Sequence, residues 1–244
     1  MVRYQEIADS LERVLGAGDG GLKAMPSEYE MCQRYGASRT TIRAALKQLD
    51  AQGLIERRQG KGTFYRSRHI TKKLGSIVDF YTEARMAGRL PTTRVISRIV
   101  RQPAPTEFGL FGAEVAKGGI VDLTRLGSLD DEPAVLQHSR IPHATLGEVD
   151  EALLVQGSLY CYLAERCGIH IATVEETLEP YSVQPDEAAH LGIAPGAAVF
   201  LSQRHSRDIV GTVIEVSINL IRGDIYRFTT HREGRHGERS GVWP

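Results

Sequence analysis

The segment Met25–Tyr65 constrains the fold of this chain most, because two helix starts and a glycine-rich hairpin follow one another within it. Ser27, followed three residues later by Glu30, is the pattern of a capping box, which predicts the start of a helix. Ser38 is a second cap of the same kind and predicts a helix over Arg39–Gln52. The sequence therefore predicts two short helices joined by a tight turn.

The second of these helices has an apolar face and a basic face. Apolar residues recur at spacings of three and four, which places them on one buried stripe: Ile42, Ala45, Leu46 and Leu49. The opposite face carries Arg39, Arg43 and Lys47, with Thr40 near its edge. Like charges four residues apart destabilise a helix by roughly a few tenths of a kcal/mol, and a bound polyanion would offset this cost. A plain solvated face is the alternative interpretation.

A basic hairpin follows the second helix. Leu54–Arg58 and Thr63–Tyr65 read as two strands joined by a loop that contains Gly60 and Gly62, with Lys61 between them. Such a loop by itself is more often an ordinary surface turn. A helix–turn–helix whose charges lie on the second helix, followed directly by a basic hairpin, indicates DNA binding. Arg3–Leu15 has the apolar spacing of a supporting first helix.

Over residues 1–66, the chain resembles the winged-helix domain of GntR-family bacterial transcription regulators. The resemblance is carried by Pro26-Ser27-Glu28, Ser38–Arg43, Gly53-Leu54-Ile55 and Arg58–Phe64. In that family the positions matching Arg39, Thr40, Thr41 and Arg43 contact bases and phosphates, and the position matching Gly60 enters the minor groove. The full set of DNA contacts that the resemblance implies is Ser27, Ser38, Arg39, Thr40, Thr41, Arg43, Arg58, Gly60, Lys61 and Gly62. The family usually has Arg where this chain has Tyr29, so the operator sequence need not be the one usual in the family.

Charge is divided unevenly along the chain. The whole sequence is neutral, with 30 basic and 30 acidic residues, but residues 1–73 hold 14 Lys and Arg against 8 Asp and Glu. The remaining residues hold 16 basic against 22 acidic side chains. The basic part supplies the salt-dependent attraction to phosphates that DNA binding needs.

Length and composition limit the remaining possibilities. A chain of 244 residues leaves room beyond such a domain for one more domain with its own core. No apolar run approaches the ~20 residues of a membrane span, and no secretory start is present. Three cysteines without a CxxC spacing suit a reduced cytoplasm, and the histidines lack a metal-motif spacing. We expect a cytoplasmic protein with no cofactor and no metal.

The rest of the chain reads as an α+β domain built on an antiparallel sheet. Predicted helices cover 77–87, 106–110, 159–167 and 185–191. Predicted strands cover 94–101, 119–126, 133–141, 172–183, 198–207, 213–220 and about 226–230. The polar stretch Arg66–Gly75 reads as an interdomain linker. The expected organisation is a DNA-binding domain at 1–66, a linker at 67–75, a second domain at 76–233 and a tail at 234–244.

This second part resembles the UTRA effector domain that defines the HutC subfamily of GntR regulators. Four segments carry the resemblance in order: Asp79–Gly88, Gly157–Leu163, Asp186–Gly196 and Glu215–Phe228. The resemblance implies a chorismate-lyase-like fold that binds small, usually anionic molecules and changes how a dimer holds its two DNA-reading domains. The implied effector residues are Arg125, Gln137, His138, Ser158, Tyr160, Arg204 and Glu215. Gly127 stands where relatives have a second Arg, and Ile221 replaces a frequent Tyr.

Simpler interpretations remain for several of these residues. For Arg125 the alternative is an ion pair with a surface acid, and for Ser158 it is a role only as the cap of the helix that follows. The two roles of Ser158 are compatible, since a capped helix N-terminus is itself an anion site. For Glu215 and Arg204 the alternative is a cross-strand ion pair with each other.

The function expected from the sequence is a ligand-responsive transcription repressor. It would bind a near-palindromic double-stranded operator as a homodimer. A small anionic effector, namely a phosphorylated sugar, a phosphonate or an organic acid, would release it. Two alternatives are a lyase-type enzyme and an architectural DNA binder. The enzyme is disfavoured because no nucleophile–base–acid set is visible.

Overall fold

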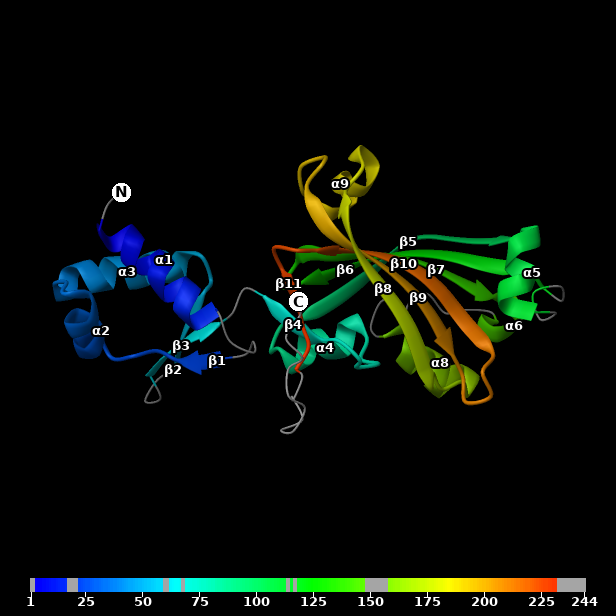
Figure 1. Cartoon of the computed structure of the whole chain (residues 1–244), viewed down its shortest axis with the longest axis horizontal. Coiled ribbons are helices and arrows are strands. Elements are labelled where there is room, and N and C mark those ends of the chain that lie inside the picture. Colours follow the sequence, from blue (N-terminus) through cyan, green and yellow to red (C-terminus); the bar gives the residue numbers. More distant parts are fainter. Residues whose placement is uncertain are drawn as a thin grey trace, which may run out of the picture.

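The computed structural model describes residues 3–16, 22–58, 62–66, 69–112, 115, 118–147 and 158–231. Two domains lie one after the other along the long axis of the molecule (Figure 1). The first contains three helices and a small sheet. The second is built on a six-stranded sheet. Each has its own hydrophobic clusters. The predicted fold class, a helix-turn-helix domain joined to an α+β domain, is confirmed.

The N-terminal domain is a winged helix-turn-helix. Its elements are α1 (Arg3–Gly16), β1 (Leu22–Ala24), α2 (Glu28–Tyr35), α3 (Arg39–Ala51), β2 (Ile55–Arg58) and β3 (Gly62–Arg66). The three strands form an antiparallel sheet in the order β1-β3-β2. The three helices and the hairpin are as predicted. Strand β1 was not predicted, since it is only three residues long and pairs with the distant β3.

Local hydrogen bonds start both helices of the helix-turn-helix. The Ser27 hydroxyl accepts from the Glu30 backbone N–H at 3.2 Å, and the Glu30 carboxylate accepts from the Ser27 N–H at 2.8 Å. Ser38 caps α3 by accepting from the Thr41 N–H at 3.2 Å. Between the helices, Gly36 adopts a φ of 55°, which glycine tolerates without steric cost. The short-range pattern of the sequence therefore determines the turn.

The apolar stripe of α3 forms the centre of the first core. Ile42, Ala45 and Leu49 are each 0% exposed, and they pack with α1 and α2. Burying this stripe fixes the rotation of α3, because its basic face must then point outward. The core thus sets which side chains the domain presents.

The second domain contains one six-stranded antiparallel sheet in the order β5-β6-β7-β10-β9-β8. Its strands are β5 (Pro91–Arg101), β6 (Ile120–Leu129), β7 (Glu132–Pro142), β8 (Thr173–Ser182), β9 (Ala198–Arg207) and β10 (Val213–Arg222). The antiparallel α+β expectation is confirmed. The central strands β7 and β10 pair with each other, although about 70 residues of chain lie between them, enough at ~3.3 Å per residue to span far more than the sheet.

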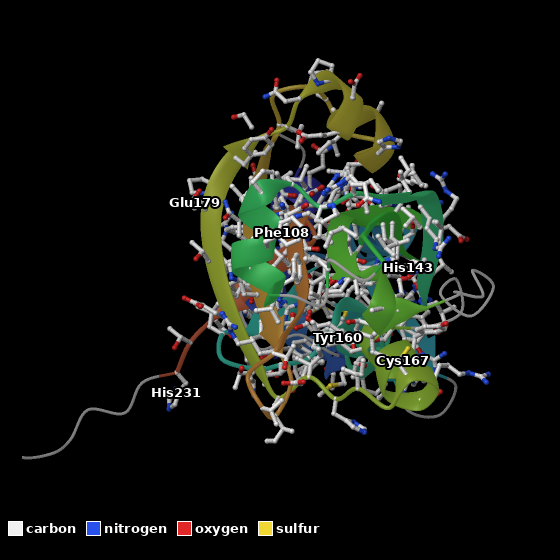
Figure 2. The ribbon with its side chains drawn as sticks, turned by 90° about the vertical axis from the view of Figure 1, so that its right-hand side faces the viewer. Phe108, His143, Tyr160, Cys167, Glu179 and His231 are labelled. Atoms are coloured by element: carbon white, nitrogen blue, oxygen red, sulfur yellow. The ribbon has the colours of Figure 1, made fainter. Side chains whose placement is uncertain are left out.

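Helices cover both faces of this sheet. They are α4 (Phe80–Met86), α5 (Pro105–Phe111), α6 (His143–Leu146), α8 (Leu159–Cys167) and α9 (Pro185–Leu191). The apolar residues of α8 pack on Leu123 and Ile141, whereas those of α9 pack on Leu126 and Leu136 of the other face. Figure 2 shows α8, marked by Tyr160 and Cys167, and the edge strand β8, marked by Glu179. Helix α6 was not predicted, being a single turn.

The stretch predicted as a linker contains a strand. β4 (Ile70–Lys73) pairs in parallel with β11 (Tyr226–Thr229), and Ile70 and Lys72 are 2% and 5% exposed. The polar composition of 67–75 concealed this alternation, and the partner strand lies at the far end of the chain. The segment after the wing is therefore anchored in the second domain, between the reader and the six-stranded sheet (Figure 1).

Two smaller observations complete the fold. Helix α4 begins later than the predicted 77–87, because Asp79 caps it by accepting from the Thr82 N–H at 3.0 Å. Within the residues that the structure describes, no helix is long and apolar enough to cross a membrane.

Candidate DNA-reading surface and effector cavity

The basic face of α3 is open to solvent. Arg39, Thr40 and Arg43 are exposed, and the half-buried Thr41 hydroxyl lies 2.9 Å from that of Ser38. Ser27 and Ser38 act first as helix caps, so any DNA contact they make would be added to that role. The predicted DNA-reading face of α3 is thus exposed to solvent, while the hydroxyl groups of both serines already cap helices.

Arg43 is held by an acid from the neighbouring helix. Its Nε donates to both carboxylate oxygens of Glu28, at 3.1 and 3.0 Å, and its side chain is 68% exposed. The bond uses the inner nitrogen of the guanidinium. Guanine takes two guanidinium donors through O6 and N7, and the outer terminal nitrogens suit that contact. Glu28 therefore orients Arg43 rather than burying it.

The hairpin is only partly described. Arg58 donates from Nε to Glu56 at 2.9 Å, and its guanidinium lies 5.4 Å from the centre of the Phe64 ring. Gly62 opens β3 with a φ of 103°. Gly60 and Lys61 lie outside the described residues, so their predicted contacts with DNA stay predictions.

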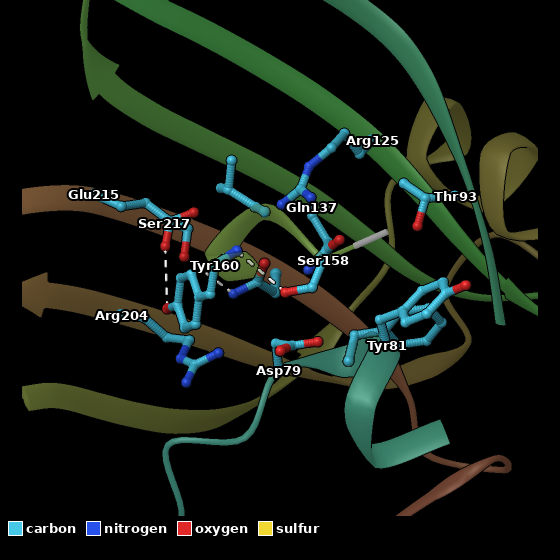
Figure 3. A pocket seen from close by; sticks show the side chains of 13 residues that line it. Asp79, Tyr81, Thr93, Arg125, Gln137, Ser158, Tyr160, Arg204, Glu215 and Ser217 are labelled. Atoms are coloured by element: carbon cyan, nitrogen blue, oxygen red, sulfur yellow. Dashed lines mark hydrogen bonds between the residues drawn. The ribbon is translucent and has the colours of Figure 1, made fainter. Parts of the chain in front are cut away.

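In the second domain, a cavity opens between the sheet and the N-terminal ends of α4 and α8 (Figure 3). It contains about 390 Å³ of empty space, including the part open to solvent. Six of the seven predicted effector residues line it: Arg125, Gln137, Ser158, Tyr160, Arg204 and Glu215. These residues come from five elements, namely β6, β7, β9, β10 and α8 with its cap, and the fold brings them together.

The floor of the cavity belongs to a band of polar side chains on five adjacent strands, β6, β7, β10, β9 and β8. In one row Arg125 lies opposite Gln137, Gln137 opposite Asn219, and Asn219 opposite Ser202. The neighbouring row reads Ser139, Ser217, Arg204 and Glu176. Except for the half-buried Gln137 and Glu176, these side chains are buried, at 7% exposure or less. A buried polar band of this size at the centre of a sheet indicates a binding surface.

Two arginines face this band from opposite sides. Arg125 on β6 is 5% exposed and Arg204 on β9 is 7% exposed. Their strands are three strand spacings apart, about 14 Å, and both side chains line the cavity. Figure 3 shows them on either side of Tyr160 and Ser158.

Both arginines keep unused hydrogen-bond donors. The buried Nε of Arg125, and the Nε and one terminal nitrogen of Arg204, have no hydrogen-bond partner. Burial lowers the pKa of Arg125, opposed by the negative charge of Glu215. A surface acid as partner of Arg125 is therefore excluded, and buried donors left unbonded are costly. An acceptor supplied by a ligand would satisfy them.

The acids of the cavity are already bonded. Glu215 accepts from the Ser139 hydroxyl at 2.6 Å, from Tyr160 at 3.2 Å and from Ser206 at 3.3 Å. Burial is the main reason why the pKa of Tyr160 is raised, so this hydroxyl stays protonated and donates. The cross-strand pair of Glu215 with Arg204 does not form. Glu215 faces Ser206 across the strands, while the charge nearest Arg204 is Glu176, at 3.7 Å.

Ser158 combines both roles considered for it. Its hydroxyl caps α8 by accepting from the N–H groups of Tyr160 and Cys161, at 3.1 and 3.3 Å, and the residue also lines the cavity. The positive end of the α8 dipole therefore faces the cavity. Together with Arg125 it defines the most anion-attracting side of the site.

His138 does not belong to this site. Adjacent residues of a strand point to opposite faces, so Gln137 lines the cavity and His138 points to the α9 side, where its ring bonds to Thr124 at 3.1 Å. Burial lowers the pKa of His138 there, while Glu187 raises it. The inclusion of His138 is corrected by simple strand alternation.

Several lining residues were not predicted: Asp79, Phe80, Tyr81, Thr93, Leu159, Ser217 and Asn219. Ser217 and Asn219 follow Glu215 at steps of two on β10, so their position was readable from the alternation of that strand. Asp79 was readable as the cap of α4. Thr93 and Tyr81 carry no such local signal.

Gly127 on β6 is enclosed by Phe80. A Cβ at this position would lie 2.7 Å from the Phe80 ring. The aromatic ring thus occupies the space a side chain at 127 would need. The glycine and the phenylalanine together close this side of the cavity.

No group of three or more potential metal ligands occurs in the part of the chain that the structure describes. The chemistry of the site is that of hydrogen bonds and charge. A basic helix-turn-helix coupled to an enclosed polar cavity defines a DNA-binding regulator with an effector domain.

Comparison with known families agrees with this class. Residues 3–64 match the family described as bacterial regulatory proteins, gntR family, and residues 86–227 match the UTRA domain. The chain belongs to the GntR family and has the HutC-type architecture, a GntR reader followed by a UTRA domain. It is a DNA-binding transcriptional repressor and not an enzyme.

Named relatives cover nearly the whole chain. The HTH-type transcriptional repressor NagR of Bacillus subtilis strain 168 is 30% identical over 86% of this chain and 85% of its own length. The repressor PhnF of Mycolicibacterium smegmatis is 28% identical over 94% and 92%. The crystal structure of PhnF from Mycobacterium smegmatis superimposes with a TM-score of 0.64 at 24% identity, covering 94% of this chain and all of that one. This last match supports the fold.

Proposed function

We propose that this repressor responds to a small anionic effector bound in the cavity of the second domain, and that it acts in the cytoplasm as a homodimer on a near-palindromic operator. The observation that carries the proposal is the pair of buried arginines with unbonded donors, Arg125 and Arg204. Phosphorylated sugars, phosphonates and organic acids are the ligand classes that supply the missing acceptors.

The hydrogen-bonding capacity of the cavity favours an anion. Glu215 is occupied by three hydroxyl donors, and Asp79 accepts from Thr82 through both of its oxygens. What remains unbonded is donor capacity, on the arginines. An anionic group accepts several such bonds at once, and bonds between ions are about twice as strong as neutral ones.

A chain of charges links the cavity to the strand that follows the wing. Arg204 lies 3.7 Å from Glu176, which lies 3.8 Å from Lys72 of β4, and Lys72 lies 3.6 Å from Glu83 of α4. An anion that draws Arg204 toward the cavity weakens its attraction to Glu176 and changes the balance at Lys72. Because β4 directly follows β3 of the reader, this network is a route from effector to DNA-binding domain.

The expected response is a shift between two populations of the dimer. Effector binding changes DNA affinity only by as much as the effector prefers one arrangement of the readers over the other. Typical couplings of roughly 1–3 kcal/mol correspond to about 5- to 150-fold changes in affinity. Operator fragments selected from random DNA, titrated in gel shifts with and without each ligand class, test this. Unchanged DNA affinity at saturating ligand would contradict it.

Arg43→Ala should weaken operator binding by about 1–3 kcal/mol and relax the base preference at one position of each half-site, since a base contact is lost. Gel-shift titration and repeated selection of random DNA measure the two effects. Arg13→Ala on the exposed face of α1 removes the same charge from outside α3 and serves as the control. Equal affinities of wild type and the Arg43 variant would show that α3 does not read bases there.

The free energy of unfolding should fall as the pH rises from about 5 to 7, because Glu83 loses its proton in this range. Burial of its carboxyl group raises its pKa to about 7. The positive charges of Lys72 and Arg204 lower this pKa, whereas the nearby acids Glu176 and Asp79 raise it. The folded state thus keeps a proton that the unfolded state releases above pH ~4.5. The stabilisation is complete below that pH and is lost as the pH rises to ~7, at a rate of at most about 1.4 kcal/mol per pH unit. In Glu83→Gln, urea midpoints should vary less over this window. An unchanged pH profile would refute the assignment.

A further inference from the structure

Four charged side chains meet between the effector cavity and the strand that follows the wing. They form one charge cluster, with a member from each of four elements: Lys72 of β4, Glu83 of α4, Glu176 of β8 and Arg204 of β9. The amino group of Lys72 lies 3.6 Å from Glu83 and 3.8 Å from Glu176. The Nε of Arg204 lies 3.7 Å from Glu176. The four side chains are between 6% and 16% exposed, so dissolved salt screens these charges little.

The charge cluster lines a second cavity beside the effector cavity. This second cavity contains about 320 Å³ of empty space, including the part open to solvent, and all four members of the cluster line it. Arg204 lines the effector cavity as well (Figure 3). Its Nε and one terminal nitrogen have no hydrogen-bond partner. An anion that binds to Arg204 therefore lies next to the charge cluster.

Glu83 is the member of the cluster whose charge changes near neutral pH. Burial raises its pKa to about 7. Charged and titratable groups face it from five elements: Lys72 of β4, Arg204 of β9, Glu176 of β8, Asp79 at the start of α4 and Tyr226 of β11. The two cations lower the pKa of Glu83, whereas the two acids raise it. Burial first, and then the charge of Glu83, raises the pKa of Tyr226 well above its usual value, so that hydroxyl stays protonated.

The net charge of the cluster depends on the proton of Glu83. With Glu83 ionised, two cations and two carboxylates balance. With Glu83 protonated, one positive charge is in surplus. An anion on Arg204 balances that surplus in the protonated state, but it adds an unpaired negative charge in the ionised state. The bound anion and the proton on Glu83 therefore favour each other, and each must strengthen the binding of the other by the same factor.

We propose that the charge cluster makes the effector cavity sensitive to pH: an anionic effector binds together with a proton on Glu83, and therefore binds more tightly in acid than in base. This inference rests on the proposed function and adds a regulatory input to the same cavity. Protonation of Glu83 leaves Glu176 as the only negative partner of Lys72 within the cluster. The attraction between β4 and α4 therefore weakens in the effector-bound state, and β4 directly follows the wing of the reader.

The test measures the affinity of the full chain for sulfate by calorimetric titration between about pH 6 and pH 8 at constant ionic strength. Sulfate keeps its charge over this range, whereas a phosphate monoester titrates near pH ~6 and would obscure the effect. Wild type should bind sulfate about three- to tenfold more tightly at the lower pH, since a pKa change of about one unit corresponds to a tenfold change in affinity. Arg125→Met should abolish binding at both pH values, which locates the sulfate in the effector cavity.

Glu83→Gln is the decisive variant, because glutamine keeps the shape and the uncharged state of the protonated side chain and does not titrate. At either pH it should bind sulfate as tightly as wild type does in acid. Glu179→Gln is the matched control, an exposed change on β8 that lines neither cavity. It should keep the pH dependence of wild type.

The contrary outcomes are distinct from one another. Equal affinity of wild type at both pH values would overturn the coupling and leave the anion site intact. A pH dependence that persists in Glu83→Gln would overturn the role of the charge cluster. Its loss in His170→Gln would then assign the proton to that exposed histidine, which lines a neighbouring pocket with Asp79 and Tyr160. Failure of sulfate to bind wild type at either pH would overturn the proposed function itself.

Discussion

Arg125→Met should abolish the response to the effector and leave the empty protein as stable as wild type or more stable. The wild-type guanidinium is buried with an unbonded Nε, and burial lowers its pKa. Replacing a buried, poorly satisfied ion by an apolar side chain of similar length is often neutral or stabilising by about 1–4 kcal/mol. The residue would thus be kept for binding at a cost in stability.

Thermal unfolding with and without ligand separates these two effects. A ligand at ~100 times its dissociation constant adds about 2.7 kcal/mol, which for a domain of this size raises Tm by roughly 5–10 °C. Wild type should show this rise and Arg125→Met should show none. Arg94→Met, an exposed arginine on β5 outside the cavity, controls for the loss of charge. An empty Arg125 variant that melts well below wild type would make Arg125 a structural residue.

The N-terminal domain was predictable from the sequence because its signals are local. Ser27 and Ser38 cap helices through bonds to residues three positions away, and the stripe of α3 repeats at helical spacing. β4 and β11 lack such signals. Each is four residues long and forms a strand only because it pairs with the other. The two strands are roughly 150 residues apart in the sequence, a separation about ten times the length of an average helix.

The cavity was predictable in part. Arg125, Ser158, Tyr160 and Glu215 came from the resemblance, and the fold brings them together. The inclusion of His138 was wrong, because side chains alternate along a strand and His138 therefore points to the face opposite to Gln137. The hydrogen bonds of each group could not be predicted from the sequence. Nothing in the sequence tells that Glu215 is saturated by hydroxyls while Arg204 is not, since the partners come from other strands.

Leu49→Ala should unfold the DNA-binding domain while the effector domain stays folded. Leu49 is 0% exposed and lies in a cluster built only from residues of the first domain. Such a truncation costs about 2–5 kcal/mol. A domain of about 60 residues has a total stability of roughly 3–9 kcal/mol, so the loss removes most or all of it. Operator binding should disappear together with the first domain.

Calorimetry tests whether the two domains melt separately. The hydrophobic clusters of the second domain contain none of the residues of the first, so the second melting transition and its rise with ligand should persist in Leu49→Ala. Asp50→Ala, an exposed change in the next position of α3, should alter neither transition by more than about 0.5 kcal/mol. If both transitions shift down together in the Leu49 variant, the reader and the effector domain unfold as one cooperative unit. The anchored strand β4 would then transmit stability as well as the effector signal.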